Sequence, residues 1–403
     1  MIDSGSRLWW RATLALCLGS ILVFLNLYQA HPLLPLLAEA FSVSSLRAAA
    51  ALSACTAGLA VGLLPAASLA DQVGRRQVML GALLGAIAIS PLIPLCRSFD
   101  ALLALRFVQG IFLAGLPATA IAYMGEEFSK KAMVSAVGIY IAANSLGGIA
   151  GRVVAGLLAG WQGEWQDAFW GIALVSALLL PVVAWLLPAQ QGFVVSEPRR
   201  GELFRALAMH LKEPLLVGAY LIGGLNFMVF LNQYSYLTFL LSQAPFSLPA
   251  QWLGLLFLTY LPGTLASSLS GRVSQRVGSA QAMTCGIVIM MAGALLLLLG
   301  SISAMLGGLL ISSFGFFLTH ASASHWVGQH VQRHRAVASS LYLIAYYLGA
   351  SLGGIYLHPF WEAAQVPGMV GGMLLVLALT AAISVWLGKR KAQTRPEPGL
   401  CQR

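Results

Sequence analysis

The sequence carries very little charge for its length. Only 9% of its 403 residues are Asp, Glu, Lys or Arg, whereas 59% are apolar and the mean hydropathy is +0.82. An ordinary soluble domain is about 25% charged, so the charged residues here are too few to cover a surface that faces water. The composition excludes a typical soluble protein and predicts an integral membrane protein.

The sequence also lacks the patterns that hold disulfides, metals and nucleotides. Its five cysteines show no paired or metal-ligand spacing, and no phosphate-binding G-x-x-x-x-G-K-[ST] motif occurs. The apolar runs contain no set of acid, nucleophile and metal-ligand residues of the kind that an enzyme needs. The polar segments are too short for a signalling domain, which disfavours a receptor or scaffold. We therefore expect no cofactor, no bound metal and no enzymatic activity.

Long apolar runs take the place of charge. A helix needs about 20 apolar residues to cross the hydrocarbon core of a bilayer, and barrel strands would instead alternate over about ten residues. The first run is too long for a signal peptide and no cleavage site follows it, so we take it as a helix. The twelve predicted transmembrane helices cover roughly 12–37, 47–69, 77–96, 100–123, 132–159, 168–188, 214–241, 251–270, 281–300, 304–326, 335–360 and 368–388.

The placement of the basic residues behind the formal net charge of +10 indicates how the chain is oriented in the membrane. When both termini are assigned to one side, 19 of the 23 Lys and Arg residues lie on that side, and the others are Arg47, Arg97, Arg106 and Arg152. This bias is typical of membrane proteins whose basic loops stay in the cytoplasm. It predicts cytoplasmic N- and C-termini in the inner membrane and disfavours nucleic acid as a partner.

Two repeats divide the chain into similar halves. Residues 67–76 (ASLADQVGRR) resemble residues 271–280 (GRVSQRVGSA) at an offset of 204, and SLGGI occurs at 145–149 and 351–355. Repeats at one offset signal duplicated architecture. We predict an all-α protein with a six-helix bundle over 1–190, a cytoplasmic linker over 191–213, a second six-helix bundle over 214–390 and a cytoplasmic tail over 391–403.

These residues resemble the major facilitator superfamily, and within it the bacterial twelve-helix efflux branch, whose members are similar to drug:proton antiporters. The family's loop motif G-x-L-A-D-R-x-G-R-R matches residues 67–76, except that Ala67 replaces glycine and Gln72 replaces arginine. The resemblance implies two related bundles with the substrate bound between them, the arrangement that is general in this superfamily. It also implies a secondary transporter that works by alternating access.

The loop motif predicts a conformational latch. Gly74 permits a tight turn, and basic residues in a cytoplasmic loop hold the topology. A topology anchor alone would not need Asp71, so we interpret the cluster as a latch that closes the cytoplasmic side. Its predicted members are Asp71, Gly74, Arg75, Arg76, Glu126 and Glu127.

Two arginines lie inside apolar runs, where charge is costly. Arg106, Gln109 and Gly110 resemble the family motif R-x-x-Q-G, which implies a cavity-facing arginine linked to proton coupling; the alternative is snorkelling to the outer surface or pairing with Glu39. Arg152 lies in a run that resembles the antiporter motif, in the place of its proline. The run also contains Gly138, Gly147, Gly151 and Gly156, whose spacing favours close helix packing. We expect Arg152 to contact a headgroup or a gate near the outer surface.

Uncharged polar residues complete the predicted cavity. They are Asn26, Gln29, Asn144, Asn226, Gln233 and His320. His320 is either a proton carrier or a member of an interhelical hydrogen bond. All 13 acidic residues lie at helix ends or in loops, so a cavity with arginine and no acid favours neutral or anionic solutes.

The leading hypothesis is proton-coupled efflux of a small organic solute by a monomer. The missing membrane carboxylates leave a second class open: an uncoupled facilitator or importer of a neutral or anionic metabolite.

Overall fold

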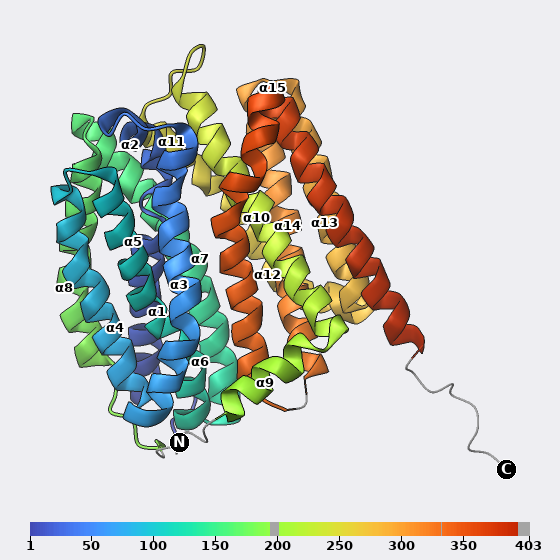
Figure 1. Ribbon diagram of the computed structural model, residues 1–403. Helices are drawn as coiled ribbons and strands as arrows, with labels where there is room; N and C mark the ends of the chain where they lie inside the picture. Colours follow the sequence, from blue (N-terminus) through green and yellow to red (C-terminus); the bar gives the residue numbers. More distant parts are fainter. Residues whose placement is uncertain (194–200, 332, 394–403) are drawn as a thin grey trace. The chain divides into compact units, whose positions relative to one another are not determined.

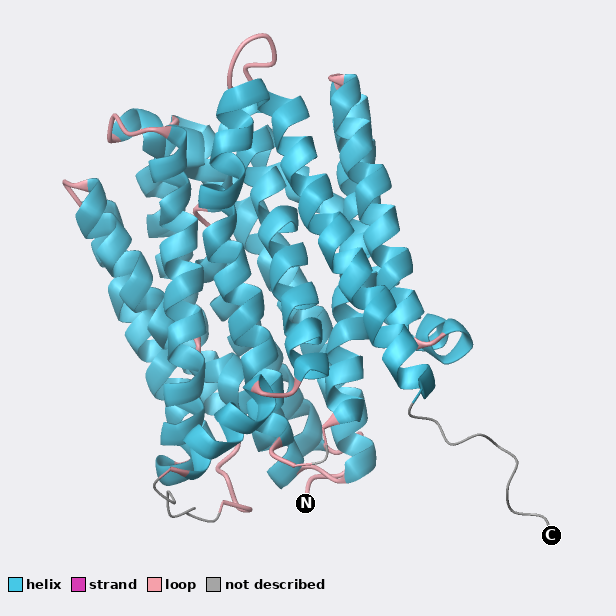
Figure 2. Cartoon of the chain, turned by 45° about the vertical axis from the view of Figure 1, so that its right-hand side comes forward, coloured by secondary structure: helices cyan, strands magenta, loops and turns pink. Residues whose placement is uncertain are grey.

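The computed structural model describes residues 1–193, 201–331 and 333–393. Within these residues the regular structure is helical and contains no strand (Figure 2). A helix pairs its backbone N–H and C=O groups internally, and the hydrocarbon core of a membrane offers these groups no other hydrogen-bond partner. The predicted all-α membrane fold is confirmed. Residues 194–200 of the predicted linker and residues 394–403 of the predicted tail lie outside the described part.

The first half of the chain forms six spans, three of which are interrupted. Proline interrupts the first and third spans, because it lacks the N–H that a continuous helix requires. The helices are α1 (Arg7–Tyr28), η1 (His31–Leu33), α2 (Leu34–Ala40), α3 (Ser45–Val73), α4 (Arg75–Ile89), η2 (Ser90–Leu95), α5 (Phe99–Leu113), α6 (Gly115–Glu127), α7 (Lys130–Gln162) and α8 (Trp165–Leu186) (Figure 1).

The second half begins with a short helix, α9, that precedes its first span. The helices are α9 (Glu202–Leu211), α10 (Pro214–Ser242), α11 (Ala250–Leu255), η3 (Leu256–Tyr260), α12 (Leu261–Val277), α13 (Ser279–Leu296), η4 (Leu297–Leu299), α14 (Ile302–His330) and α15 (Arg335–Gln393).

The last helix, α15, contains two membrane crossings. Its 59 residues would extend about 90 Å at 1.5 Å per residue, three times the thickness of the hydrocarbon core. The backbone leaves the helical conformation at Ala364 and Gln365, where φ is −157° and 46°. The described residues hold eleven helices long and apolar enough to span a membrane, and this division of the last one matches the twelve predicted runs.

The chain packs into two compact units, of which the first draws on both halves of the sequence and the second on the second half alone. The first comprises Met1–Glu202, Leu231–Leu258 and Ala350–Ile355, and the second comprises Leu203–Phe230, Thr259–Gly349 and Tyr356–Arg403. The predicted domains follow the sequence repeat, whereas these units follow packing. The domain boundaries at 190 and 214 therefore stay a prediction.

The two copies of the loop repeat adopt the same backbone turn. Gly74 has φ 103° and ψ 147°, and Gly278 has φ 91° and ψ 149°. Each ends one helix and begins the next, and only glycine adopts this conformation without strain. The duplicated sequence is thus matched by a duplicated turn.

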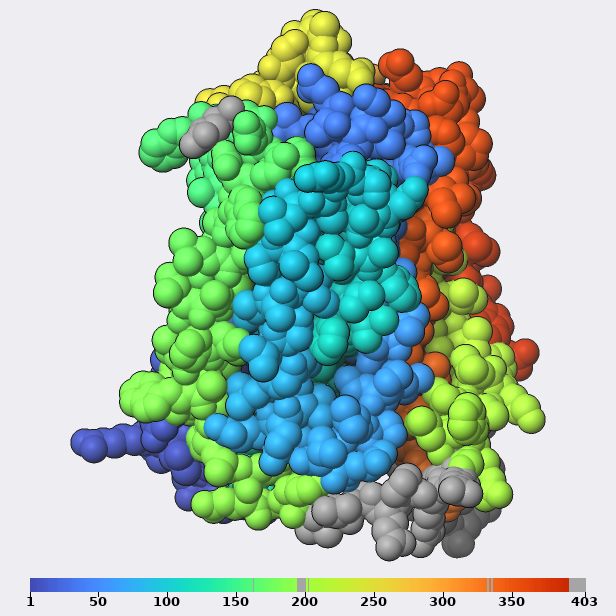
Figure 3. All heavy atoms as spheres, turned by 60° about the vertical axis from the view of Figure 1, so that its left-hand side comes forward, coloured from blue at the N-terminus to red at the C-terminus, as the bar shows by residue number. Residues whose placement is uncertain are grey.

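The first unit exposes an apolar surface. Figure 3 shows a face on which α4 and α5 lie side by side. Exposed leucines and aromatic residues occur on α4, α5 and α8, among them Leu84, Phe107, Leu178 and Trp185. An apolar surface of this extent faces lipid in a membrane protein.

Candidate functional site

Arg106 binds the end of the first helix. α1 ends at Tyr28, and the guanidinium donates to the backbone carbonyls of Asn26 (2.9 Å) and Leu27 (2.7 Å) from Nη1 and Nη2, and to that of Ala51 (3.2 Å) from Nε. The carbonyl end of a helix carries a partial negative charge, which a cation stabilises. Arg106 is fully buried, so its charge holds α1, α3 and α5 together in the first unit.

A network of uncharged side chains surrounds this arginine. Gln109 accepts from Arg106 Nη1 (2.5 Å) and donates to Ser90 Oγ (2.9 Å). Ser90 in turn donates to Asn26 Oδ1 (3.0 Å), and Asn26 Nδ2 donates to Ser176 Oγ (2.8 Å). All five side chains are buried. The amides of the predicted cavity residues Asn26 and Gln109 are therefore hydrogen-bonded to Ser90, Ser176 and Arg106, all within the first unit.

Two other buried glutamines have unfilled hydrogen-bonding capacity. Gln29 donates from Nε2 to the Asn26 carbonyl (3.2 Å), but within the described residues its Oε1 has no partner, and Gln233 has none at either amide atom. Both are 0% exposed. The repeat offset of 204 residues relates these two positions. A buried polar atom without a partner costs about 1–3 kcal/mol, so both amides are available to a polar ligand.

The remaining predicted polar residues have identified partners. Asn144 bonds to Ser20, and Asn226 Oδ1 accepts from Thr380 (2.9 Å) while its Nδ2 is unfilled by any described residue. His320 Nδ1 lies 2.9 Å from the Tyr342 hydroxyl, which is the interhelical hydrogen bond of the two predicted alternatives. His320 also lies beside Tyr346, with ring centroids 4.6 Å apart.

The predicted glycine face of α7 packs against two helices. A Cβ at Gly147 would lie 2.8 Å from Ile21 Cα, and one at Gly151 would lie 2.6 Å from the Leu25 carbonyl oxygen, both in α1. A Cβ at Gly156 would lie 2.8 Å from the Cα of Gly254 in α11. Close packing is therefore present at these three positions.

The interpretation of Gly138 as a packing glycine is wrong. A Cβ there would meet no atom of the described chain within 4 Å, and the residue is exposed. The position faces away from neighbouring helices, so packing does not require glycine.

Arg152 lies in a buried cluster that we call the His31 seam: Tyr28, His31, Arg152, Ser235 and Phe257. The Arg152 guanidinium donates from Nε to His31 Nδ1 (3.2 Å) and from Nη1 to the Gly148 carbonyl (2.8 Å). It lies 3.8 Å above the ring of Tyr28 and 4.8 Å from that of Phe257. Only 1% of Arg152 is exposed, which favours a gate contact over a headgroup contact.

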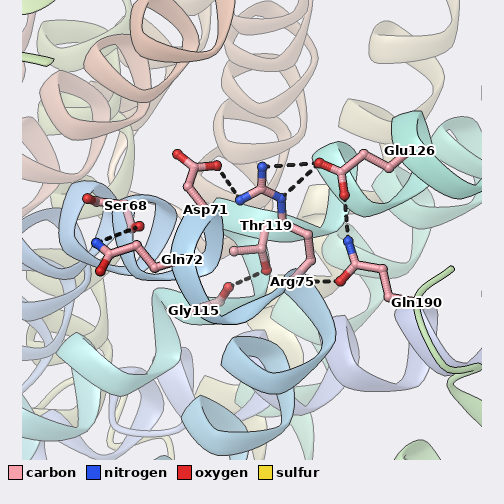
Figure 4. A network of polar contacts seen from close by, with 8 residues as sticks. All are labelled: Ser68, Asp71, Gln72, Arg75, Gly115, Thr119, Glu126 and Gln190. Carbon is pink, nitrogen blue, oxygen red and sulfur yellow. Dashed lines mark hydrogen bonds and ion pairs between the residues drawn. The ribbon is translucent and has the colours of Figure 1, made fainter. Parts of the chain in front are cut away.

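The loop motif forms a polar cluster in the first unit (Figure 4). The Arg75 guanidinium bridges Asp71 Oδ1 (2.5 Å) and Glu126 Oε1 (3.1 Å). Gln190 joins the cluster, because its Oε1 accepts from the Arg75 backbone N–H (2.9 Å) and its Nε2 donates to Glu126 (2.5 Å). The cluster connects α3, α4, α6 and the segment after α8.

The other two predicted latch residues hold that same segment. Arg76 donates to the carbonyls of Ala184 and Leu187 at the end of α8, and Glu127 Oε1 accepts from the backbone N–H groups of Gln191 and Gly192. All these contacts lie within the first unit. The contacts thus connect the ends of α3, α4, α6 and α8 to one another.

Two of these contributors are not predicted by the motifs. Gln190 lies at the very edge of the predicted first bundle, and no motif pairs His31 with Arg152. The repeat offset offers a signal for His31, because it relates His31 to Ser235, and His31 Nε2 lies 2.9 Å from Ser235 Oγ.

Taken together, the duplicated helices, the buried polar network and the fastened loops define a membrane transport protein with two related halves. A family model, the Major Facilitator Superfamily, matches residues 16–354. The chain belongs to this superfamily, and it is a multi-pass membrane protein that transports a small solute.

Several relatives are similar over the whole chain. The MFS-type transporter YybF of Bacillus subtilis is 32% identical, covering 99% of this chain and 99% of its own. The inner membrane transport protein YnfM of Escherichia coli is 33% identical, covering 96% and 93%. Among solved structures, a bacterial homologue of the human lysosomal transporter Spinster, inward-facing and unoccupied, matches with a TM-score of 0.78 at 17% identity, covering 98% of this chain and 100% of its own.

Proposed function

We propose that this protein exports a small neutral or anionic organic solute across the inner membrane in exchange for protons. The observation that carries the proposal is the pair of buried glutamines. Gln29 and Gln233 hold equivalent positions in the two sequence halves, and both retain amide atoms that no described residue fills inside the first unit. A polar solute that accepts and donates hydrogen bonds would satisfy them.

The charge of the buried side chains supports a neutral or anionic solute. Arg106 and Arg152 are buried in apolar spans, whereas each Asp and Glu of the described residues lies near a helix end, in a loop or beside the break in α15. Fixed positive charge in a low-dielectric site attracts anions and repels cations. A lipophilic cation would have no carboxylate counter-ion within the spans.

Proton exchange and orientation follow from the family resemblance and the loop charges. The R-x-x-Q-G match and the close-packed Gly147, Gly151 and Gly156 of α7 support the antiport branch, and the basic loops support cytoplasmic termini. We further propose that the protein acts as a monomer, with the solute and protons as its partners.

A liposome assay with a panel of compounds tests the proposal. Purified protein is reconstituted with a pH-sensitive dye inside, and neutral, anionic and cationic compounds are added outside one at a time. A transported, coupled compound changes the internal pH, whereas protein-free liposomes given the same compound supply the control. Flux of a radiolabelled hit that is the same with and without a pH gradient would refute proton coupling and favour the uncoupled facilitator.

The Gln233→Leu variant links the assay to the site. It removes both unfilled amide atoms and leaves a slightly shorter, apolar side chain. We expect it to lose transport of the hit compound while it still reconstitutes into liposomes. Transport at the wild-type rate would show that Gln233 does not bind the solute.

A further inference from the structure

The hydrogen bonds of the His31 seam fix the protonation of His31. Arginine only donates hydrogen bonds, so His31 Nδ1, which lies 3.2 Å from Arg152 Nε, must accept. The imidazole proton then resides on Nε2, which donates to Ser235 Oγ at 2.9 Å. His31 is therefore neutral in this arrangement, with one nitrogen committed to α7 and the other to α10.

A second proton on His31 is incompatible with this geometry. It would occupy Nδ1 and remove the acceptor of the Arg152 hydrogen bond. It would also place two cations in contact in a site where His31 is 0% and Arg152 1% exposed, and repulsion between like charges is strong where water is excluded. Relief requires Arg152 to move away from His31.

Movement of Arg152 would loosen the seam as a whole. Its guanidinium lies against the rings of Tyr28 and Phe257, and its own backbone carbonyl lies against Gly254 of α11, where a Cβ would be 2.9 Å away. The elements that meet here are α1, η1, α7, α10, α11 and η3. They come from both halves of the sequence, as a gate between the halves would.

Among the described groups that face His31, Arg152 is the charged one. η1 packs against α2, α7 and α11, of which α11 carries no titratable side chain and α2 carries Glu39, which is exposed. α7 presents Arg152, whose charge acts on His31. α10 presents the Ser235 hydroxyl and η3 presents the Phe257 ring, 4.6 Å from the imidazole centroid; the Tyr28 phenol ring faces Arg152.

A cavity reaches η1 at the residue that follows His31, although the seam residues themselves do not line it. This cavity of about 460 Å³ is lined by Pro32, Pro35, Glu39 and Gln243, among others. Glu39 provides a carboxylate at the cavity, where it can exchange protons with water.

We propose that His31 is a proton-binding site that opens the seam when it is loaded and closes it when it is empty. A proton from the aqueous cavity binds Nδ1, the Arg152 Nε–H loses its acceptor, and α7 separates from η1, α10 and α11. Release of the same proton restores the hydrogen bond. This inference rests on the proposed proton exchange and supplies its carrier without a membrane carboxylate.

Distance measurements between spin labels test the seam directly. Trp161 on α7 and Trp252 on α11 are 88% and 58% exposed, so labels there are accessible and report on the two sides of the contact. Both are changed to cysteine in a variant without native cysteines, reconstituted in lipid nanodiscs and frozen at about pH 8 and about pH 5.5, which bracket the usual histidine pKa of about 6.5. We expect one short distance at the higher pH and a longer major component at the lower pH.

Variants assign this response to His31. His31→Gln keeps an acceptor for Arg152 and a donor for Ser235 but does not titrate, so it should keep the short distance at both pH values. His325→Gln, an exposed histidine of α14, is the matched control and should respond like the wild type. Arg152→Gln keeps a donor without the charge, so it should open less at low pH. Circular dichroism checks that each variant is folded.

The outcomes separate this inference from the proposed function. An unchanged distance in the wild type, or a His31→Gln protein that opens at low pH as the wild type does, overturns the inference. If the liposome assay shows no proton coupling while the seam still opens through His31, the proton site stands and the exchange reaction fails. If coupling is intact and the seam does not respond, another group carries the proton.

Discussion

The contact between α1 and α7 can be tested by a single methyl group. A Cβ at Gly151 would lie 2.6 Å from the Leu25 carbonyl oxygen and 2.7 Å from its Cα, and backbone atoms cannot rotate aside as a side chain can. At Gly138, in the same helix, a Cβ would meet nothing in the described chain within 4 Å. Gly151→Ala therefore forces the two helices apart, and Gly138→Ala does not.

The expected difference follows from two opposing contributions. Replacing glycine by alanine in a helix gains about 0.8–1.0 kcal/mol at either position. Overpacking at Gly151 costs about 1–3 kcal/mol. The helix contribution cancels in the comparison, so Gly151→Ala should have a free energy of unfolding about 1–3 kcal/mol below that of Gly138→Ala.

Thermal unfolding in one detergent–lipid mixture measures this difference. The midpoint of Gly138→Ala should equal or exceed that of the wild type, and the midpoint of Gly151→Ala should lie below both. Gly147→Ala, which would approach Ile21 Cα to 2.8 Å, should change in the same direction as Gly151→Ala. Equal midpoints for Gly138→Ala and Gly151→Ala would refute the close helix contact.

Three further changes probe the polar sites. Arg106→Met leaves three buried carbonyls and the Gln109 amide without this donor, and a buried acceptor left unsatisfied costs about 1–3 kcal/mol, so the thermal midpoint should fall, and fall less for Arg106→Lys; equal midpoints for the wild type and Arg106→Met would contradict a clamping role. Gln233→Leu removes a buried amide that no described residue satisfies, so stability measured by thermal unfolding should rise by about 1 kcal/mol; a loss of stability would show that the amide is satisfied. Glu126→Gln breaks a partly exposed ion pair with Arg75, so stability should fall by less than about 1 kcal/mol, and high salt should reduce the difference; a larger loss that persists in salt would contradict a solvent-screened pair.

The membrane crossings are predictable because hydropathy alone determines them. A run of about 20 apolar residues has few alternatives to a spanning helix, and the predicted gap at 361–367 contains the observed break at Ala364 and Gln365. The interruptions at η1 and η2 are signalled only by prolines, which allow a kink without fixing its place. The exact ends of α1 and α2 therefore required the structure.

The partners of buried polar residues are less predictable. Sequence spacing places Arg75 and Glu126 on one side of the membrane, and that suffices to suggest their contact, because loops on one side meet in a bundle. The family motif implies a cavity-facing Arg106, whereas its binding to the carbonyls of Asn26 and Leu27 depends on where α1 ends. The pairing of Arg152 with His31 depends on the packing of α7 beside η1, which periodicity does not specify.

The contact between His31 and Ser235 has a consequence for the ancestry of the protein. These residues occupy matching places in the duplicated sequence, and each touches the other. In an ancestor assembled from two identical six-helix subunits, the position of His31 and Ser235 would lie on the twofold axis. A residue there would contact its own copy in the other subunit. Fusion of two such copies would free them to diverge, and the present contact is an unequal pair of imidazole and hydroxyl, in which only His31 can take up a proton.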